Sequence, residues 1–320
     1  MILEKILITG ASGQLGRVLT EELQKKYGVD NVVASDLRLD TNFKGVFEVL
    51  DATQFDTLNE LVSTYKITQI YHLAAILSAN GEKQPLNTWD INMKTLFNVL
   101  EVSRIQKILK VFFPSSIAVF GDNVERIDTP QDSNLTPATV YGMSKVSGEN
   151  WGNYYYLKYG LDVRSIRYPG IIGHQSLPGG GTTDYAVDIY HKAVNNGKFE
   201  CFLNESTTLP MIYMDDVIRG TLELMEAPVE HIKIRTSYNI AGLSFSPAEI
   251  TASIKEFYPE FEVTYKPDFR QAIADTWPKS IDDSLARNDW GWKPKFDLTM
   301  MTRVMIDNLR LKNSLEGIEL

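Results

Sequence analysis

Three glycines near the N-terminus constrain this 320-residue chain more than any other feature. Gly10, Gly13 and Gly16 directly follow the apolar run 5–9 and lie at the start of an amphipathic stretch, Gln14–Tyr27. In that position glycines allow a tight turn out of a strand, a close approach of phosphate to the backbone, and close packing of a helix on a sheet. The free N–H groups at the start of the helix attract phosphate. The pattern therefore predicts a strand–helix unit that binds a dinucleotide.

Short apolar runs alternate with amphipathic stretches through the first half of the chain. Unbroken apolar runs are typical of strands buried in a parallel sheet, and their alternation with helices indicates right-handed strand–helix–strand units. We therefore predict an α/β fold with a doubly wound, parallel, Rossmann-type sheet and a smaller α+β lobe. The predicted strands are 5–9, 31–35, 46–50, 69–73, 110–115 and 162–167.

The pattern changes after about residue 167, where glycine and proline cluster at 169–173 and 178–181. We predict an NAD-binding domain over 1–169 and a mainly substrate-binding lobe over 170–320. Two segments, about 184–196 and 215–240, are expected to return to the first domain. Ligands usually bind in the cleft between two such lobes, and we place the active site there.

An acidic residue ends the second predicted strand, twenty residues after Gly16. A carboxylate at this place accepts hydrogen bonds from the adenosine ribose and would repel the 2′-phosphate of NADP. Asp36 therefore favours NAD, whereas the nearby Arg38 is the residue that could accommodate a phosphate. Further cofactor contacts are expected in the glycine loop and at the strand ends, from Gln14, Leu15, Leu37, Asp51, Ala52, Leu73, Ala74 and Ala75.

A tyrosine and a lysine open a long predicted helix that ends near Tyr159. Tyr141 and Lys145 are four residues apart, so both can face the cleft. A free tyrosine titrates at ~10, and a nearby ammonium together with a positive nicotinamide would lower its pKa. Ser115 and Ser116 end the fifth predicted strand, where a hydroxyl can donate to a substrate oxygen. These residues predict acid–base chemistry beside the cofactor.

Composition argues against several other classes of protein. The 32 basic and 41 acidic residues give a net charge of −9, which disfavours binding to nucleic acid. The single cysteine, Cys201, and four scattered histidines lack the spacing of a metal site, so no metal is expected. The chain has no signal peptide and no apolar run of about 20 residues, so we expect a cytoplasmic protein without a membrane span.

Over nearly its whole length the chain resembles the extended short-chain dehydrogenase/reductase family. The motifs that carry the resemblance are 10–16, 72–75, 115–116, 118–121 and 141–145. The resemblance implies that Tyr141 transfers the proton and that Lys145 lowers its pKa and holds the nicotinamide ribose. It also implies that Ser116, three residues before Val119, binds the reacting hydroxyl. Asn92 occupies the structural asparagine position of the family, and we include it with Ser115 among the cofactor contacts.

Four segments, 77–79, 167–173, 178–186 and 275–278, resemble the L-threonine 3-dehydrogenase branch of that family. This resemblance implies oxidation of the C3 hydroxyl of L-threonine to 2-amino-3-oxobutanoate with NAD and without metal. Asp184 could pair with the substrate ammonium, and Gly179–Gly181 suit a lid over a small ligand. By the resemblance, Tyr168, Pro169 and Ile171 contact the nicotinamide end, and the residues near the amino acid are Ser78, Thr182, Thr183, Asp184 and Trp277.

Two other functions stay open at this point. A nucleotide-sugar epimerase or dehydratase could use the same scaffold, although Phe120 stands where sugar epimerases usually carry tyrosine. A non-catalytic NAD-sensing regulator could keep the glycine loop, but it would not need intact Ser116, Tyr141 and Lys145. The predicted helices 86–105 and 141–159 carry apolar residues on more than one face. Because the family commonly dimerises through these two helices, we predict a homodimer.

Overall fold

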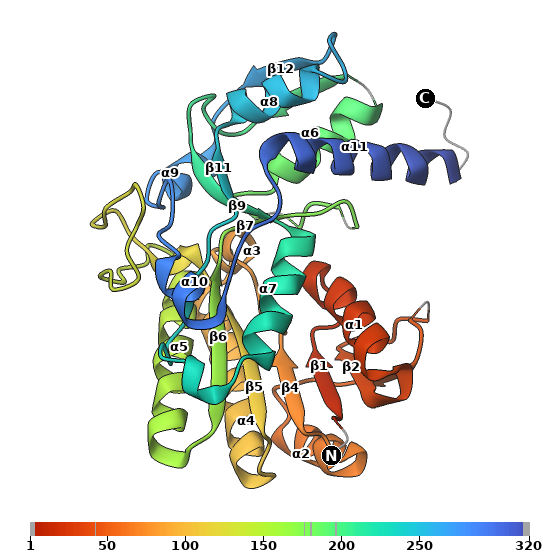
Figure 1. The fold of residues 1–320 in the computed structure, drawn as a ribbon, viewed down its shortest axis with the longest axis vertical. Helices are drawn as coiled ribbons and strands as arrows, with labels where there is room; N and C mark the ends of the chain where they lie inside the picture. The colour runs from red at the N-terminus through yellow and green to blue at the C-terminus, as the bar shows by residue number, and fades with distance from the viewer. Residues whose placement is uncertain (1–3, 42, 176, 180, 196, 316–320) are drawn as a thin grey trace.

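The computed structural model describes residues 4–315 except 42, 176, 180 and 196. Gly180 of the predicted lid and Asn196 of the predicted segment 184–196 lie outside the described residues. A central seven-stranded sheet, with helices on both faces, confirms the α/β prediction (Figure 1). All its strands run parallel, in the order β10-β6-β5-β4-β1-β2-β3.

The six predicted strands form within one residue of their predicted ends. Their side chains are largely buried because helices cover both faces of the sheet, and this is why they are nearly continuous apolar runs. The seventh strand comes from the second half of the chain and pairs with β6. The strands are β1 (Ile6–Thr9), β2 (Val32–Asp36), β3 (Val46–Val49), β4 (Gln69–His72), β5 (Lys110–Ser116), β6 (Asp162–Tyr168) and β10 (Tyr238–Asn239).

Helices α2 (Phe55–Tyr65), α4 (Pro85–Ile105) and α5 (Val140–Tyr159) enclose one core with the sheet. Helices α1 (Gln14–Tyr27) and α7 (Met214–Glu226) cover the other face. Helix α5 can lie close to the sheet because residue 148 is a glycine. A Cβ at this position would overlap the Phe113 ring. The remaining elements near the sheet are α3 (Ser78–Gly81), α10 (Ser284–Trp290) and the 3₁₀ turns η1 (Val29–Asn31), η2 (Ile117–Val119) and η3 (Val229–His231).

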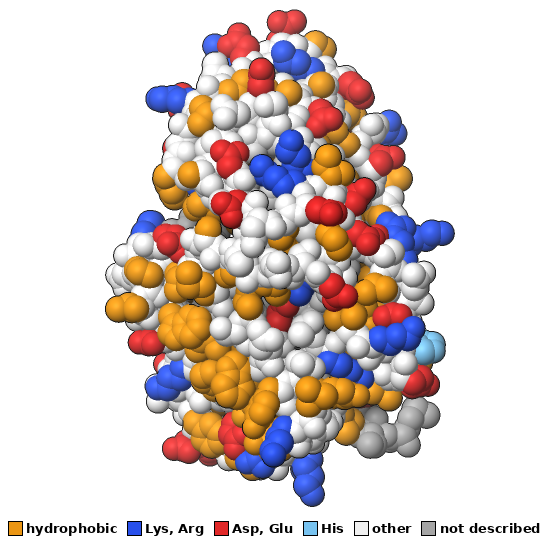
Figure 2. Space-filling view, turned by 90° about the vertical axis from the view of Figure 1, so that its left-hand side faces the viewer, with side chains coloured by type: hydrophobic (Ala, Val, Ile, Leu, Met, Phe, Trp, Pro, Cys, Tyr) orange, Lys and Arg blue, Asp and Glu red, His pale blue; other side chains and the backbone are white. Residues whose placement is uncertain are grey.

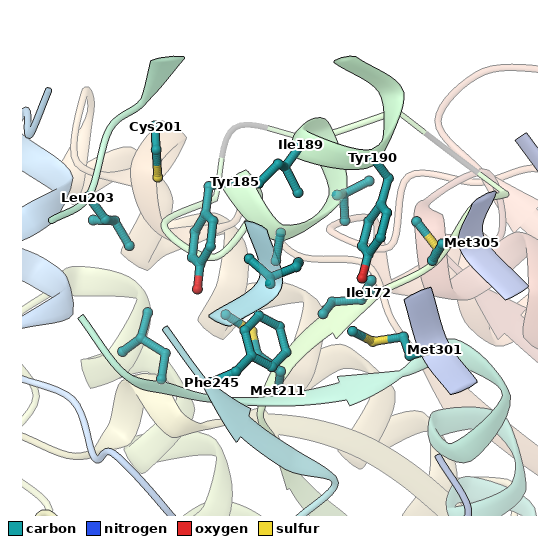
Figure 3. Packing of buried hydrophobic residues seen from close by; sticks show 14 of the residues in the cluster. Ile172, Tyr185, Ile189, Tyr190, Cys201, Leu203, Met211, Phe245, Met301 and Met305 are labelled. Atoms are coloured by element: carbon teal, nitrogen blue, oxygen red, sulfur yellow. The ribbon is translucent and has the colours of Figure 1, made fainter. Parts of the chain in front are cut away.

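A smaller lobe lies at one end of the sheet. It holds a three-stranded sheet of β7 (Gly170–Ile172), β9 (Leu209–Tyr213) and β11 (Leu243–Phe245), and a two-stranded sheet of β8 (Lys198–Cys201) and β12 (Glu262–Tyr265). Figure 3 shows side chains of α6, β9, β11 and α11 pointing toward one another in its core. Its helices are α6 (Tyr185–Asn195), α8 (Pro247–Lys255), α9 (Phe269–Ala274) and α11 (Leu298–Leu315).

One predicted placement is wrong. Segment 184–196 was expected to return to the first domain, but α6 packs on α8, α11 and β8 of the smaller lobe. Its buried residues Tyr185, Ile189 and Tyr190 supply much of that lobe's core. By contrast, α7 packs on α1 and β6, and β10 extends the central sheet. The division of the chain at residue 169 stays a prediction. None of the described helices is long and apolar enough to cross a membrane.

Candidate active site

A cavity of about 430 Å³ lies where the parallel strands end, between the central sheet and the smaller lobe. Ligands of open parallel sheets bind at this edge. Among the described residues, every predicted site residue except Asn92 lines the cavity. Those residues are Gly10, Gly13, Gln14, Leu15, Gly16, Asp36, Leu37, Ser78, Thr182, Thr183, Asp184 and Trp277, with Asp51, Ala52, Leu73, Ala74, Ala75, Ser115, Ser116, Tyr141, Lys145, Tyr168, Pro169 and Ile171.

The glycine loop has the shape that a pyrophosphate needs. Gly10 has a φ of +76°, and a Cβ there would come within 2.7 Å of the Ala74 nitrogen. A Cβ on Gly16 would overlap the carbonyl oxygen of Gly10. Gly13 is the N-cap of α1 and has no side chain to cap the first turn, so the turn's N–H groups remain available at the cavity. The loop therefore fits the phosphates of a dinucleotide.

The carboxylate of Asp36 is fixed beside this loop. Its Oδ2 accepts a hydrogen bond of 3.0 Å from the Ser12 N–H, and its Oδ1 accepts one of 2.7 Å from the Leu37 N–H. Arg38 is exposed and is not among the cavity residues. A negative charge held at the end of β2 suits ribose hydroxyls and disfavours an additional phosphate. The arrangement therefore supports the predicted preference for NAD.

The two adjacent serines at the end of β5 have different partners. The Ser116 hydroxyl hydrogen-bonds the phenol of Tyr141 and accepts the Ala118 N–H at 3.2 Å. The Ser115 hydroxyl instead donates to the carboxylate of Glu149 at 2.6 Å. Tyr141 lies in the first turn of α5, at the edge where β5 ends. The structure thus brings Ser116, not Ser115, to the phenol.

Lys145 lies one turn beyond Tyr141 and is almost fully buried, with 4% of its surface exposed. Its Nζ donates to the Pro114 carbonyl at 2.7 Å and lies 5.3 Å from the centre of the Tyr141 ring. Burial lowers the pKa of Lys145 to about 7, while the charge of Glu149 raises it. Burial raises the pKa of Tyr141 to about 12, and the Ser116 hydrogen bond opposes that rise. Burial therefore dominates, and the pKa of Tyr141 lies above its usual value. That Lys145 and a positive nicotinamide lower this pKa stays a prediction.

The histidine of the 72–75 motif is buried behind the lysine. Its Nδ1 lies 2.8 Å from the Thr9 hydroxyl, and its ring stacks on Phe113. Burial, helped by the charge of Lys145, lowers the pKa of His72 to about 3. His72 is therefore neutral at physiological pH, and it adds no second positive charge beside Lys145.

Asn92 does not line the cavity, which differs from its predicted place among the cofactor contacts. It lies on α4, behind the segment that follows β4. Its Oδ1 accepts the Ile76 N–H at 2.8 Å, and its Nδ2 donates to the Ile76 carbonyl at 3.1 Å and to the Ser144 hydroxyl at 3.3 Å. Asn92 therefore ties the segment that carries Ser78 to α5.

The predicted substrate end of the cavity contains a polar group that has no partner among the described residues. The hydroxyl of Thr182 is buried, with 1% of the residue exposed, and no described residue hydrogen-bonds it. One oxygen of Asp184 accepts the Gly181 N–H at 2.7 Å, so this carboxylate also shapes its own loop. A buried hydroxyl without a partner favours a ligand that can hydrogen-bond it.

Several lining residues are outside the predicted site set, among them Gly181, which was predicted only as part of the lid. Most are neighbours of predicted residues beside strand ends, and that position was the available signal, whereas Ile91 and Thr95 lie on α4. The residues are Thr9, Leu50, Thr53, Ile76, Leu77, Ile91, Thr95, Pro114, Ile117, Ala118, Gly170 and Gly181. Behind the cavity lies an unpredicted buried ion pair, in which Arg167 donates to Glu149 at 2.8 and 2.9 Å. Its signal was an acidic residue four positions after Lys145.

The glycine loop, the carboxylate at the end of β2 and the Tyr–Lys–Ser cluster all lie at one sheet edge. This arrangement is typical of nicotinamide-dependent enzymes of the short-chain dehydrogenase/reductase type. The chain belongs to the NAD dependent epimerase/dehydratase family, whose sequence profile matches residues 6–241. Its cofactor is NAD.

Known proteins similar to this chain match along nearly its whole length. An uncharacterized epimerase/dehydratase of Staphylococcus aureus is 44% identical over 98% of this chain and 99% of its own. A holo structure of a GalE-like L-threonine dehydrogenase from Cupriavidus necator is 52% identical, covers 95% of this chain and 99% of its own, and has a TM-score of 0.94. The structure of a monomeric L-threonine 3-dehydrogenase from a metagenome is 50% identical, covers 96% of this chain and 99% of its own, and has a TM-score of 0.94. These similarities support an oxidoreductase.

Proposed function

We propose that this chain is an NAD-dependent L-threonine 3-dehydrogenase, which oxidises the C3 hydroxyl of L-threonine to 2-amino-3-oxobutanoate. The observation that carries the proposal is the continuity of one cavity. The Ser116–Tyr141–Lys145 cluster opens into the same space as Thr182, Thr183 and Asp184. Similar structures of 42–52% identity bear the name L-threonine dehydrogenase. A free buried Cys201 needs no oxidising compartment, so the proposal places the enzyme in the cytoplasm.

The proposed chemistry assigns one task to each residue of the cluster. Ser116 and Tyr141 hold the C3 hydroxyl, and the Tyr141 phenolate takes its proton as C3 is oxidised. The Lys145 ammonium stabilises the phenolate. Bound NAD would supply the hydride acceptor and a positive ring charge, and the residues placed to hold it are those of the glycine loop, Asp36 and Lys145.

The site fits a zwitterionic amino acid better than a simple alcohol. An amino acid brings an ammonium and a carboxylate in addition to the reacting hydroxyl. Asp184 can receive the ammonium, and Thr182 and Thr183 can donate to the carboxylate. A site with buried polar groups rejects ligands that leave them unpaired, whereas one methyl group changes the free energy by only about 1–3 kcal/mol.

The test is a set of initial rates of NADH formation. We expect L-threonine to be the best substrate and L-serine to be slow but detectable. D-Threonine should be inactive because inversion at Cα moves the ammonium away from its partner, and 2-propanol should be inactive because it lacks both charged groups. Epimerisation of UDP-galactose is measured in parallel. Epimerase turnover without threonine oxidation would overturn the proposal and leave only the family assignment.

We also propose that the enzyme forms a homodimer through α4 and α5. Hydrophobic side chains gather over the lower half of this face (Figure 2). Phe97, Trp151 and Tyr154 expose 36%, 38% and 44% of their surface, and Leu157 exposes 74%. The Trp151 ring contacts the rings of Phe97 and Tyr154 edge to face, so these side chains already form one surface in the single chain. The glycine face of α5 lies against the sheet and directs these side chains outward.

Light scattering at micromolar concentration tests this assembly. The expected mass is that of two chains, and Leu157→Glu should reduce it to that of one. A wild-type mass of one chain would refute the dimer and match the structure described as monomeric, which is 50% identical to this chain.

A further inference from the structure

Residues 120–139 form a long loop that joins the two catalytic elements, η2 after Ser116 and α5 with Tyr141 (Figure 1, yellow). The loop pairs with segment 277–282, which is about 150 residues further along the chain. Thr129 forms a parallel bridge with Ile281, and its N–H donates to the Ser280 carbonyl at 3.0 Å. The Asp282 N–H donates back to the Thr129 carbonyl at 3.1 Å. The catalytic loop is thus bound to the segment that carries Trp277.

Arg126 makes the contacts closest to that tryptophan. Its Nε and Nη2 both donate to the Trp277 carbonyl, at 3.2 and 2.9 Å. The carbonyl of Arg126 accepts the N–H groups of Lys279 at 2.6 Å and Ser280 at 3.1 Å. One residue of the loop therefore holds the turn after Trp277 through both its side chain and its backbone.

The Trp277 side chain lines the cavity near its substrate end and is only 5% exposed. It follows α9, a helix of six residues, and its N–H donates to the Ala274 carbonyl at 3.1 Å. So short a helix adds little rigidity of its own. The indole packs in the core of the smaller lobe, and the Trp277 carbonyl is held by Arg126, so the position of Trp277 at the cavity wall depends on both sets of contacts.

We propose that Arg126 is a positioning residue, which fixes Trp277 as the wall against which the substrate binds. The inference deepens the proposed function and rests on it. Arg126 is not among the cavity residues, so its effect passes through Trp277. Because the cofactor end is built by other segments, the effect should fall on substrate binding and leave NAD binding unchanged.

The experiment compares Arg126→Met, which keeps the stem and removes both donors, with Arg126→Lys, which keeps a charged donor. In Arg126→Met the KM for L-threonine should rise about tenfold, because Trp277 is no longer held in place as the wall against which the substrate binds; a tenfold change corresponds to about 1.4 kcal/mol of binding free energy. The kcat and the Kd for NAD should stay within about twofold. Arg126→Lys should recover part of the KM.

Ser280→Ala is the matched control within the same pairing. It removes a hydroxyl that accepts the Asp128 N–H at 2.6 Å and donates to the Asp128 carboxylate at 2.9 Å, without touching Trp277. It should leave the KM for threonine unchanged. An equal rise of KM in Ser280→Ala, or an equal loss of NAD affinity in Arg126→Met, would show that Arg126 supports only the general fold and would overturn the proposal.

Tryptophan fluorescence separates this proposal from the proposed function. Arg126→Met should change the emission of the wild-type chain but not that of a Trp277→Phe chain, because the indole it moves is then absent. If the wild-type protein does not oxidise threonine, the proposed function fails. The fluorescence comparison still tests whether Arg126 positions Trp277. The same emission change in both backgrounds would refute the positioning of Trp277 by Arg126.

Discussion

The cofactor end of the cavity and its substrate end draw their residues from the chain in different ways. The cofactor end is built from successive strand ends of one sheet, and backbone groups and small residues supply most of it. The substrate end combines side chains from α3, the loop before α6 and the segment after α9. The first end follows from the fold of a parallel sheet, whereas the second depends on how the smaller lobe packs on it.

The two ends also differ in which polar groups are left unsatisfied. At the cofactor end, both oxygens of Asp36 accept backbone N–H groups, whereas the Ser12 hydroxyl of the glycine loop has no partner among the described residues. At the catalytic and substrate end, Thr182 has no partner among the described residues, and burial shifts the pKa values of Lys145 and Tyr141 against their charged forms. Such groups lower the stability of the free protein, and their retention is typical of residues kept for function.

The largest expected effect separates chemistry from cofactor binding. Tyr141→Phe removes only the phenolic oxygen, so turnover should fall about 10²–10⁴-fold, the usual contribution of a general base. The Kd for NAD should stay near the wild-type value. The measurements are threonine oxidation rates and NAD titration. Tyr154→Phe, on the exposed side of the same helix, is the control and should keep full activity. Near-normal turnover in Tyr141→Phe would show that another group carries the proton.

The next effect tests the cost of the buried lysine. The Lys145 pKa lies at about 7 in the folded chain against a usual value of 10.5, so the unfolded chain binds the proton first as pH falls. The stability of the wild-type protein relative to Lys145→Met should therefore fall as the pH is lowered from about 10 to about 7, and it should be constant below that pH. This change with pH is at most about 5 kcal/mol, at about 1.4 kcal/mol per pKa unit, and the lost hydrogen bond to Pro114 adds an offset that does not depend on pH.

Urea unfolding of the ligand-free proteins at pH 7, 8.5 and 10 measures this difference. Lys293→Met replaces an exposed lysine and should show no comparable dependence on pH. A difference between Lys145→Met and the wild-type protein that stays constant across this range would contradict the lowered pKa.

The third prediction concerns the choice of cofactor. Asp36→Ala should weaken NAD binding by about 1.5–3 kcal/mol, because hydrogen bonds to a charged group are lost. It should also improve the use of NADP by removing a like charge. Isothermal titration and rates with each cofactor measure both effects. If the wild-type protein uses NADP as well as NAD and Arg38→Ala abolishes that use, Arg38 sets the choice instead.

The difference between the two ends explains how much the sequence could predict. The strands were predicted within one residue because burial on both faces leaves an unbroken apolar run. The strand–helix boundary at 10–16 was equally clear from its glycines. Strand β10 has two residues, too few to produce a pattern. The apolar face of α6 indicated a helix but could not indicate which lobe it packs on, and so its placement was wrong.

The same limit applied within the site. Adjacent strand residues face opposite sides, so Ser115 and Ser116 had to differ, and the motif spacing selected Ser116. Asn92 could not be placed because helical periodicity does not show whether a polar side chain reaches a ligand or a neighbouring backbone. The contacts of Arg126 with Trp277 join residues about 150 positions apart, and local patterns hold no information on such pairs.

The smallest predicted effect tests the unsatisfied polar group at the substrate end. Thr182→Val keeps the side-chain shape and removes a hydroxyl that has no partner among the described residues. A buried polar group without a hydrogen bond costs about 1–3 kcal/mol, so the ligand-free variant should unfold at higher urea, with a gain of about 1 kcal/mol. Its KM for threonine should rise severalfold, because one substrate hydrogen bond is lost, while NAD affinity stays unchanged.

Thr302→Val provides the opposite case in the core of the smaller lobe. Its hydroxyl is equally buried but hydrogen-bonds Tyr190 at 2.8 Å and Ser253 at 2.9 Å. This variant should lose stability and keep its KM, because it leaves two partners unsatisfied far from the substrate. A loss of stability in Thr182→Val would mean that its hydroxyl is already satisfied in the free protein. An unchanged KM would remove Thr182 from the substrate site, and the polar end of the cavity would then be assigned to Thr183 and Asp184.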